Sequence, residues 1–205
     1  MVKRFVIFLI GMNVLAIGII LNTKSMLGVG SINTIPYALS QIMEISLGTV
    51  TTGVYLVFII IQLILLKKLD LKIIFQLPFS FAFGFIIDFY DLFLNFVPNN
   101  LLQQIILLVF AILLTALGAF LMIIGDIVLN PSDGIVNTIS KVLDKDYGLI
   151  KNIVDIVMIC LTVVICLVTK GYIIAIGIGT VLSAVFIGRC MAVYQWLYNK
   201  YIIKS

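Results

Sequence analysis

The chain of 205 residues has no histidine, three cysteines, one tryptophan and few charged residues, which make up 11% of it. Without histidine, catalysis by a Ser-His or Cys-His pair is excluded, and the usual metal sites are not expected. The cysteines Cys160, Cys166 and Cys190 all lie in apolar segments, where free cysteine is commonly a small buried hydrophobe, so we expect no disulfide. No glycine-rich phosphate loop follows a predicted strand. We therefore expect no enzyme, no cofactor and no metal.

What the chain has in excess is apolar residues, at 63% of the total, where soluble domains have roughly half. Several uncharged apolar runs approach the ~20 residues that cross a bilayer as a helix. The sequence therefore predicts an all-α membrane protein with six transmembrane helices. The predicted spans lie at 5–21, 47–66, 73–87 (continuing past Asp88), 105–125, 149–168 and 172–188.

The distribution of basic residues supports six spans with both termini in the cytoplasm, because cytoplasmic loops near spans collect Lys and Arg. In that arrangement only Lys24 and Lys170, of 13 basic residues, lie outside. The net charge of +4 is then explained by topology and by an anionic inner leaflet, with no nucleic acid as partner. We expect a multi-pass protein of a bacterial inner membrane, with the lipid bilayer as its first partner.

Two halves of the chain repeat one plan at a spacing of 100 residues. Ala16 and Gly18 recur as Ala116 and Gly118, small residues that let helices approach closely. Since each half holds three spans, the second half is turned over relative to the first. The sequence thus predicts two inverted three-helix repeats, residues 1–98 and 99–205.

Each predicted repeat also contains a short amphipathic stretch between its first two spans, with apolar residues at matching helical positions. These stretches, at about 33–46 and 133–146, begin with Asn33 and Asp133, which are suited to capping a helix. About 12 residues of helix reach only ~18 Å, too little to cross the membrane. The short helices either lie along the interface or dip into the membrane and return.

The third span of each half is interrupted, at Gln76-Leu77-Pro78 in one and at Gly177-Ile178-Gly179-Thr180 in the other. Proline and paired glycines weaken a helix. Paired interruptions at corresponding positions indicate a transporter binding site. The alternative is that both are packing kinks.

A family resemblance rests on Pro131-x-Asp133-Gly134 and on Gly177-x-Gly179-Thr180, read together with Leu27-Gly28 and Gly48-Thr49. With these motifs the chain resembles, over nearly its whole length, the YczE/YyaS/YitT family of bacterial membrane proteins. The resemblance implies a polytopic membrane protein, and no biochemical activity is established for that family as a whole. Ser31 and Asn33 stand where the first-half turn of such proteins often has a proline and an acidic residue.

These features favour a small-solute permease, or a solute-binding membrane component, with a midplane site for a small polar solute between the repeats. The hypothetical substrate-binding residues come from the turns and the interrupted spans: Asn33, Gln76, Pro131, Ser132, Asp133, Gly134, Gly177, Gly179 and Thr180. The alternative for the Pro131 turn is that Ser132 and Asp133 merely cap a helix.

Charged residues near the spans supply the remaining candidates. We assign ion or proton coupling to Asp88, interpret Asp155 as a helix-start acid within reach of Lys151, and place Arg189 near the headgroups at the end of its span. A non-transporting scaffold or accessory subunit is the alternative function. A homo-oligomer or a partner membrane subunit stays open.

Overall fold

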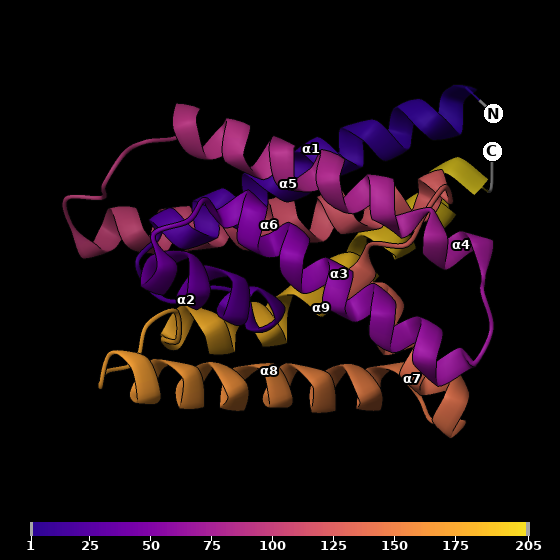
Figure 1. The fold of residues 1–205 in the computed structure, drawn as a ribbon. Coiled ribbons are helices and arrows are strands. Elements are labelled where there is room, and N and C mark those ends of the chain that lie inside the picture. The colour runs from indigo at the N-terminus through magenta and orange to yellow at the C-terminus, as the bar shows by residue number, and fades with distance from the viewer. Residues whose placement is uncertain (1, 204–205) are drawn as a thin grey trace. The chain divides into compact units, whose positions relative to one another are not determined.

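The structure is a computed structural model that describes residues 2–203 (Figure 1). Those residues form helices and connecting loops and contain no strand. Six segments are helical, long and apolar enough to cross a membrane, which confirms an all-α chain with six candidate spans. The segments are Val2–Lys24 (α1), Leu47–Leu66 (α3), Leu71–Phe93 (α4 and α5), Leu101–Gly125 (α6), Tyr147–Thr169 (α8) and Ile178–Tyr201 (α9 and the start of η2).

The outward faces of the long helices are apolar. Ile60 in α3, Phe110 in α6 and Val164 in α8 are each more than half exposed. Water would solvate such surfaces poorly, whereas hydrocarbon solvates them well and the helices satisfy their own backbone hydrogen bonds. The spans therefore imply a lipid bilayer around the protein.

Two short helices, α2 (Thr34–Met43) and α7 (Pro131–Leu143), precede α3 and α8. Each is followed by a residue in the left-handed conformation, Glu44 with φ 56° and Asp144 with φ 51°. At about 1.5 Å per residue, neither helix reaches across a bilayer. The two short helices therefore exist as predicted, and they stop at matching positions.

The side-chain caps predicted for the short helices do not form. Asn33, the last residue of the 3-10 turn η1 (Ser31–Asn33), occupies the N-cap position of α2 as predicted, but its side chain makes no capping hydrogen bond. In α7 the cap is Asn130, whose Oδ1 accepts a hydrogen bond from the Ser132 N–H at 3.2 Å. Pro131 fits the first helical position because its missing N–H needs no partner there, so the helix begins earlier than expected and Asp133 lies inside its first turn.

The third span of the first half is interrupted at Phe75, between α4 (Leu71–Ile74) and α5 (Gln76–Phe93). The interruption lies one residue before the predicted one, and Pro78 is in the first turn of α5, where a missing donor is tolerated.

The last span begins later than predicted. The helix α9 (Ile178–Tyr198) starts at Ile178, and the π-helical turn η2 (Asn199–Ile203) follows it. Residues 172–177 are not helical because Gly177 has extended backbone angles and the Gly179 N–H is bonded to the Leu27 carbonyl at 2.7 Å. Arg189 is therefore near the middle of this candidate span, not at its end. It is exposed, and its guanidinium lies 5.7 Å from the centre of the Phe186 ring.

Contacts divide the chain into two compact units that interleave its sequence. Unit 1 contains α1, α6, α9 and the end of α5, and unit 2 contains α2, α3, α4, α7, α8 and most of α5. Each unit draws on both predicted repeats, 1–98 and 99–205, so the repeat division stays a prediction.

In unit 1, α1 and α6 pack closely and run antiparallel through small residues. A Cβ added to Gly18 would lie 2.6 Å from the Thr115 Oγ1, and one added to Gly118 would lie 2.6 Å from the Leu15 Cα. The two contacts are related by the spacing of 100 residues, since Gly18 corresponds to Gly118 and Thr115 corresponds to Leu15.

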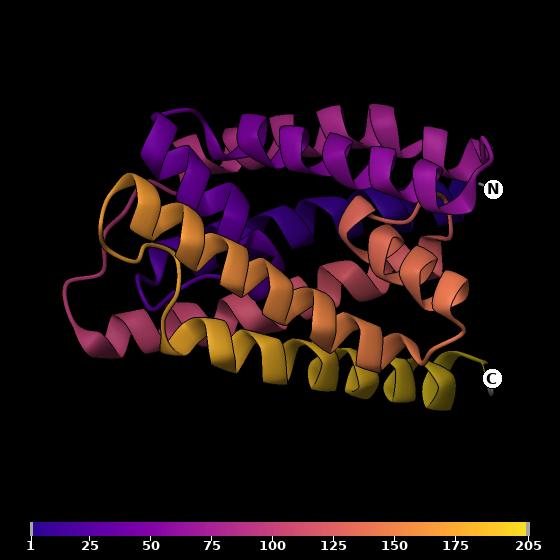
Figure 2. The ribbon, with the colours of Figure 1, turned by 60° about the horizontal axis from the view of Figure 1, so that its bottom comes forward.

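In unit 2, α2 packs on α8 and α3 packs on α7, so each short helix contacts the middle span of the other half. Figure 2 shows α8, in orange, as one uninterrupted helix that follows α7 after a short turn. The helices α3 and α5 also meet through small residues, because the Thr52 hydroxyl lies 2.9 Å from the Gly48 carbonyl and 3.1 Å from the Ser80 carbonyl. Unit 2 therefore has polar groups between membrane-length helices.

Candidate functional site

The first polar group in unit 2 surrounds the start of α7. Gln62 in α3 and Gln76 in α5 exchange two side-chain hydrogen bonds, of 3.0 and 3.2 Å, and their exposed fractions are 1% and 2%. The Thr138 hydroxyl donates to the Gln62 Oε1 at 3.5 Å. Gly134 faces this pair, since a Cβ there would lie 2.8 Å from each amide. A glycine in α7 thus makes room for two buried amides.

Seven residues before Gln62 in α3, the Tyr55 hydroxyl lies beside the Asn130 and Ser132 side chains. All three residues are buried. We call Tyr55, Gln62, Gln76, Asn130, Ser132 and Thr138 the amide cluster. Its members are uncharged donors and acceptors, which suit a neutral polar ligand or one another.

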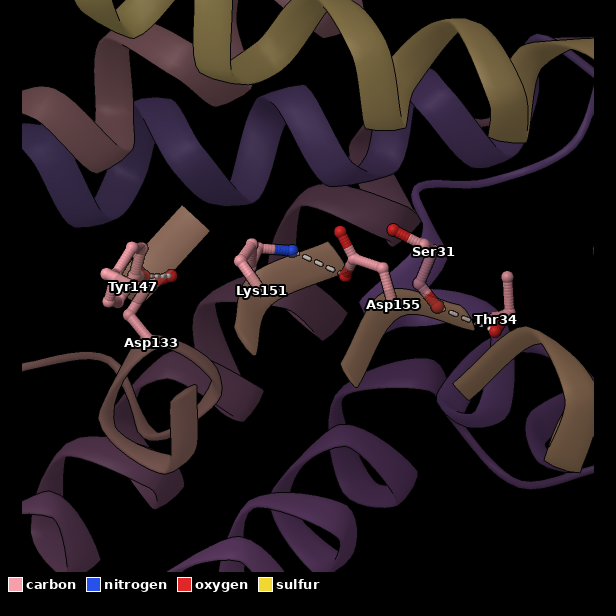
Figure 3. Close-up of polar contacts among 6 residues, drawn as sticks. All are labelled: Ser31, Thr34, Asp133, Tyr147, Lys151 and Asp155. Atoms are coloured by element: carbon pink, nitrogen blue, oxygen red, sulfur yellow. Dashed lines mark hydrogen bonds and ion pairs between the residues drawn. The ribbon is translucent and has the colours of Figure 1, made fainter. Parts of the chain in front are cut away.

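The second polar group lies between α8, η1 and α2 (Figure 3). The Lys151 ammonium and the Asp155 carboxylate are 2.5 Å apart, with side-chain exposed fractions of 31% and 11%. Figure 3 shows the Asp155 carboxylate between Lys151 and the Ser31 hydroxyl. Asp155 is the ninth residue of α8, so its interpretation as a helix-start acid is wrong: it is beyond the first turn and buried.

Hydroxyl groups extend this second group along α8. The Thr162 hydroxyl donates to the Thr34 Oγ1 at 2.8 Å, and the Thr34 hydroxyl donates to the Ser31 carbonyl at 2.7 Å. Thr34 and Thr162 are fully buried. We call Ser31, Thr34, Lys151, Asp155 and Thr162 the charged cluster.

Asp133 lies in α7 and is half-buried. Its Oδ1 accepts a hydrogen bond of 3.4 Å from the Tyr147 hydroxyl at the start of α8. Burial raises the pKa of Asp133, and the positive charge of Lys151 opposes that rise. A carboxyl group with a raised pKa can take up or release a proton at a pH closer to neutrality than an exposed aspartate.

Each cluster contains residues of both halves, and a shift of 100 residues relates contacts of one cluster to contacts of the other. Thr34 meets Thr162, and the residues 100 positions away from them, Gly134 and Gln62, also meet. Tyr55 lies beside the turn before α7, while its counterpart Asp155 faces the turn before α2. The two clusters therefore have equivalent backbone contacts, but their side chains differ in chemistry.

The predicted coupling residue, Asp88, belongs to α5, and its carboxylate lies against the start of α3. Its Oδ1 accepts a hydrogen bond from the Gly48 N–H at 2.6 Å, and its Oδ2 accepts one from the Ser46 hydroxyl at 2.7 Å. An acidic group at a helix N-terminus is stabilised by the helix dipole. This geometry is that of a helix-capping group, and ion coupling by Asp88 stays a prediction.

The predicted substrate-binding residues are divided between the units. Gln76, Ser132, Asp133 and Gly134 come together around the start of α7, with Pro131 as its first residue, while Asn33 lies at the turn before α2.

The remaining three, Gly177, Gly179 and Thr180, belong to unit 1. There the Gly177 N–H donates to the Thr180 Oγ1 at 3.2 Å, and both glycines pack on the Leu27 carbonyl. Gly28, with φ 101°, completes this tight contact, which leaves no room for a Cβ. One site holding all nine residues is therefore still a prediction.

Sequence reasoning missed several residues of the two clusters, among them Tyr55, Gln62 and Thr162. A signal was available, because Gln62 is the one amide side chain in the predicted span 47–66. The spacing of 100 residues would then have led from Gln62 to Thr162 and from Tyr55 to Asp155. In residues 2–203, no group of His, Cys, Asp and Glu that could hold a metal ion is found.

Six apolar spans with two polar clusters in one unit define the class: this is a multi-pass membrane protein. The chain belongs to a family of unknown function, DUF6198, whose model matches residues 2–196. No curated protein and no solved structure matches it. No match links it to the YczE/YyaS/YitT family, so that resemblance stays a prediction.

Proposed function

We propose that the protein is a small-solute permease, or a solute-binding membrane component, without enzymatic activity. In this proposal it spans a bacterial inner membrane as two inverted three-helix repeats, with both termini in the cytoplasm. The solute is small and polar, and it binds at the start of α7, where Gln62, Gln76 and Ser132 provide buried hydrogen-bonding groups.

The proposal rests on one observation: contacts between helices occur in pairs whose residue numbers differ by 100. Gly18 with Thr115 corresponds to Gly118 with Leu15 in unit 1, and Thr34 with Thr162 corresponds to Gly134 with Gln62 in unit 2. Antiparallel packing of α1 and α6 is what a two-fold relation between inverted halves requires. Transporters built in this way commonly bind their substrate where short or interrupted helices meet.

Burial of polar groups in the spans supports the same proposal. Polar side chains within a membrane are costly and commonly functional. Gln62, Thr162 and Asp155 are all buried inside unit 2, in helices whose outer faces are apolar.

The alternative, a scaffold or accessory subunit, depended on small-residue faces at Ala16-Gly18 and Ala116-Gly118 that could bind another protein. Ala16 and Ala116 are both 0% exposed, and the glycines face the partner helix within the chain. These faces are occupied inside unit 1, so the permease proposal is favoured.

A solute screen tests the proposal. Purified protein in mild detergent is heated with a panel of small polar metabolites, and a specific solute raises the melting temperature by mass action. We expect the shift to be lost in Ser132→Ala and Gly134→Ala and kept in Asp126→Asn, which changes an exposed acid. Uptake of that solute into proteoliposomes then separates a permease from a binding component. No shift with any solute would contradict a binding role.

A further inference from the structure

The consecutive spans α3 and α5 meet in unit 2 through two glycines. A Cβ added to Gly84 would lie 2.6 Å from the Gly48 carbonyl oxygen, and both glycines are buried. Asp88, one turn beyond Gly84, accepts hydrogen bonds from the Gly48 N–H and from Ser46, the cap of α3. The contact thus combines the close approach that small residues allow in a membrane with a polar bond at the start of one helix.

The start of α8 has the same form as the start of α3. Its cap Asp146 accepts a hydrogen bond of 3.0 Å from the backbone N–H three residues further on, as the cap Ser46 does at 3.3 Å. Gly148 follows this cap and corresponds to Gly48 at the spacing of 100 residues. Gly148 is exposed, and among residues 2–203 a Cβ there would meet only the Asp146 carboxylate, at 3.1 Å. The helix start that is covered in α3 is therefore uncovered in α8.

The matching positions of α9 are uncovered too. At the spacing of 100 residues Ala184 corresponds to Gly84 and Gly188 corresponds to Asp88. The two are four residues apart and so lie on one face of the helix. Both are exposed, and a Cβ added to Gly188 would have no neighbour within 4 Å among residues 2–203. The second half thus contains both surfaces of a contact that only the first half makes.

A charge lies at the edge of this surface. Arg189 is the twelfth of 24 residues in the candidate span Ile178–Tyr201, and it is exposed. Its guanidinium lies 5.7 Å from the centre of the Phe186 ring, a contact that does not neutralise its charge. Charged side chains within a span are costly and commonly pair with one another. We call Ala184, Gly188 and Arg189 the α9 face, and its chemistry suits a helix that brings an acidic group.

We propose that the α9 face binds the start of α8 of a second copy of this chain. Gly148 of one copy packs against Gly188 of the other, and the Asp146 carboxylate of the first pairs with Arg189 of the second. Consecutive spans cross a membrane in opposite directions, so two copies with one orientation bring α8 and α9 together antiparallel. The helices α3 and α5 pack in that way, since contacts join Gly48 to Asp88 near one end and residues 62 and 76 near the other.

A second copy is the occupant that fits both uncovered surfaces. Each chain has an acid before a glycine at the start of α8 and an arginine beside a glycine in α9. Two copies related by a two-fold axis cover both surfaces at once, in two equivalent contacts with complementary charges. A different protein with one acidic helix would cover the α9 face and leave the start of α8 exposed.

Single cysteines test the pairing between copies. In a full-length background with alanine at the three native cysteines, one copy carries Gly148→Cys, and a second copy with a larger tag carries Gly188→Cys. The two are expressed together and oxidised in the membrane with copper phenanthroline. Because each chain holds one cysteine, any disulfide joins two chains, and we expect a band that contains both tags.

The matched control replaces Gly188→Cys by Val193→Cys. Val193 is 54% exposed and lies five residues further along α9, on a different side of the helix, so we expect no linked band. Equal yields at the two positions would overturn the inference. A chain that carries both Gly148→Cys and Gly188→Cys tests the other occupant: a disulfide inside one chain, without any link between copies, also overturns it.

Two charge variants test the pairing of Arg189 with Asp146. Arg189→Asp places an acid opposite an acid, so the dissociation constant of the dimer, measured by energy transfer between tagged copies in proteoliposomes, should rise about tenfold. Adding Asp146→Asn should recover most of this loss, because asparagine also caps a helix. An unchanged dissociation constant in Arg189→Asp would contradict the pairing.

Gly188→Ile separates docking from folding. Its side chain enters open space in the single chain, so the melting temperature in detergent should not fall, whereas the close approach of a second helix is blocked. We expect the dimer signal to be lost, and a dimer that persists in this variant would overturn the inference. Solute binding at the start of α7 uses none of these residues, so the solute screen and the dimer assay give independent results.

Discussion

The amide cluster and the charged cluster are built on the same contacts and contain different chemistry. At one place Gly134 faces Gln62, and at the matching place Thr34 faces Thr162. The amide cluster has no charged member, whereas the charged cluster holds an ion pair with a separation of 2.5 Å. Duplicated packing therefore does not require duplicated side-chain chemistry: one cluster offers uncharged donors and acceptors, and the other contains an ion pair.

The correspondence between the two clusters depends on the two halves having opposite orientations in the membrane. Cysteine labelling tests these orientations, because each position either reacts or is protected. In a background without Cys160, Cys166 and Cys190, we expect Lys24→Cys and Lys170→Cys to react with a membrane-impermeant thiol reagent added outside intact cells. Lys68→Cys and Lys145→Cys should be protected, because they lie in loops predicted to face the cytoplasm. The opposite pattern would contradict the inverted repeats.

The ion pair should show the largest effect on stability. Lys151 is partly exposed, but its removal leaves the buried Asp155 carboxylate uncompensated, so Lys151→Met should lower the free energy of unfolding by about 3 kcal/mol. The double variant with Asp155→Leu should recover most of that loss. Unfolding by SDS in mixed micelles measures both. Equal losses in the single and double variants would mean that the pair does not interact.

In the amide cluster, Gly134→Ala tests the room that the glycine provides. Its Cβ would lie 2.8 Å from the Gln62 Oε1 and from the Gln76 Nε2, so at least one of these buried amides must move and its hydrogen bond is weakened or lost. We expect a loss of about 2 kcal/mol in the same unfolding assay. The matched control is Gly53→Ala in α3, where a Cβ has no neighbour within 4 Å and helix propensity improves.

A double variant sharpens the same test. Gly134→Thr together with Gln62→Thr places in the amide cluster the two residue types that meet at Thr34 and Thr162. If the two places are equivalent, the double variant should lose less stability than the sum of its single changes. If the losses of stability are additive, the two places are equivalent in backbone position but not in the side-chain pairs that they accept.

Asp133 should give the smallest effect, and one that depends on pH. Because burial raises its pKa in the folded protein, the folded state holds the proton more tightly than the unfolded chain. Stability from this group is therefore full below the unfolded pKa and falls as the pH rises through the folded pKa. Asp133→Asn should flatten this dependence and raise the melting temperature at pH 7. A melting profile from pH 4 to 8, with Asp126→Asn as control, measures it.

Much of the fold followed from local sequence signals. The length of the apolar runs predicted the spans, and the apolar stripes predicted the short helices, which stop at Met43 and Leu143, before the predicted ends at about 46 and 146. Local rules failed where a distant residue decided the outcome. The start of α9 depends on the Leu27 carbonyl. The cap of α7 is a local exception: Asn130, three residues before the predicted cap Asp133, is the residue whose side chain accepts the hydrogen bond.

The candidate site was less accessible to sequence reasoning. The turn around Ser132 and Gly134 was recognised by its capping residues and glycine, and Gln76 by the interrupted span. The partners of these residues, Gln62 and Tyr55, are isolated polar groups in the apolar stretch of α3 that follows Gly53. Which side chain they meet is set by helix packing, and that information is absent from any one segment.

The glycine contact between α1 and α6 has a consequence for biogenesis. Gly18 packs on Thr115, and Asn22 bonds the Ser183 hydroxyl at 3.1 Å, so the partners of α1 are synthesised about 100 and 160 residues after it. At about 5–20 residues per second, this first helix waits roughly 5 to 30 s in the bilayer with its glycine face and its amide uncovered. During translation α1 is therefore a client for any factor that shields unpaired helices, and a ribosome stalled before Gly125 leaves it without its natural partner.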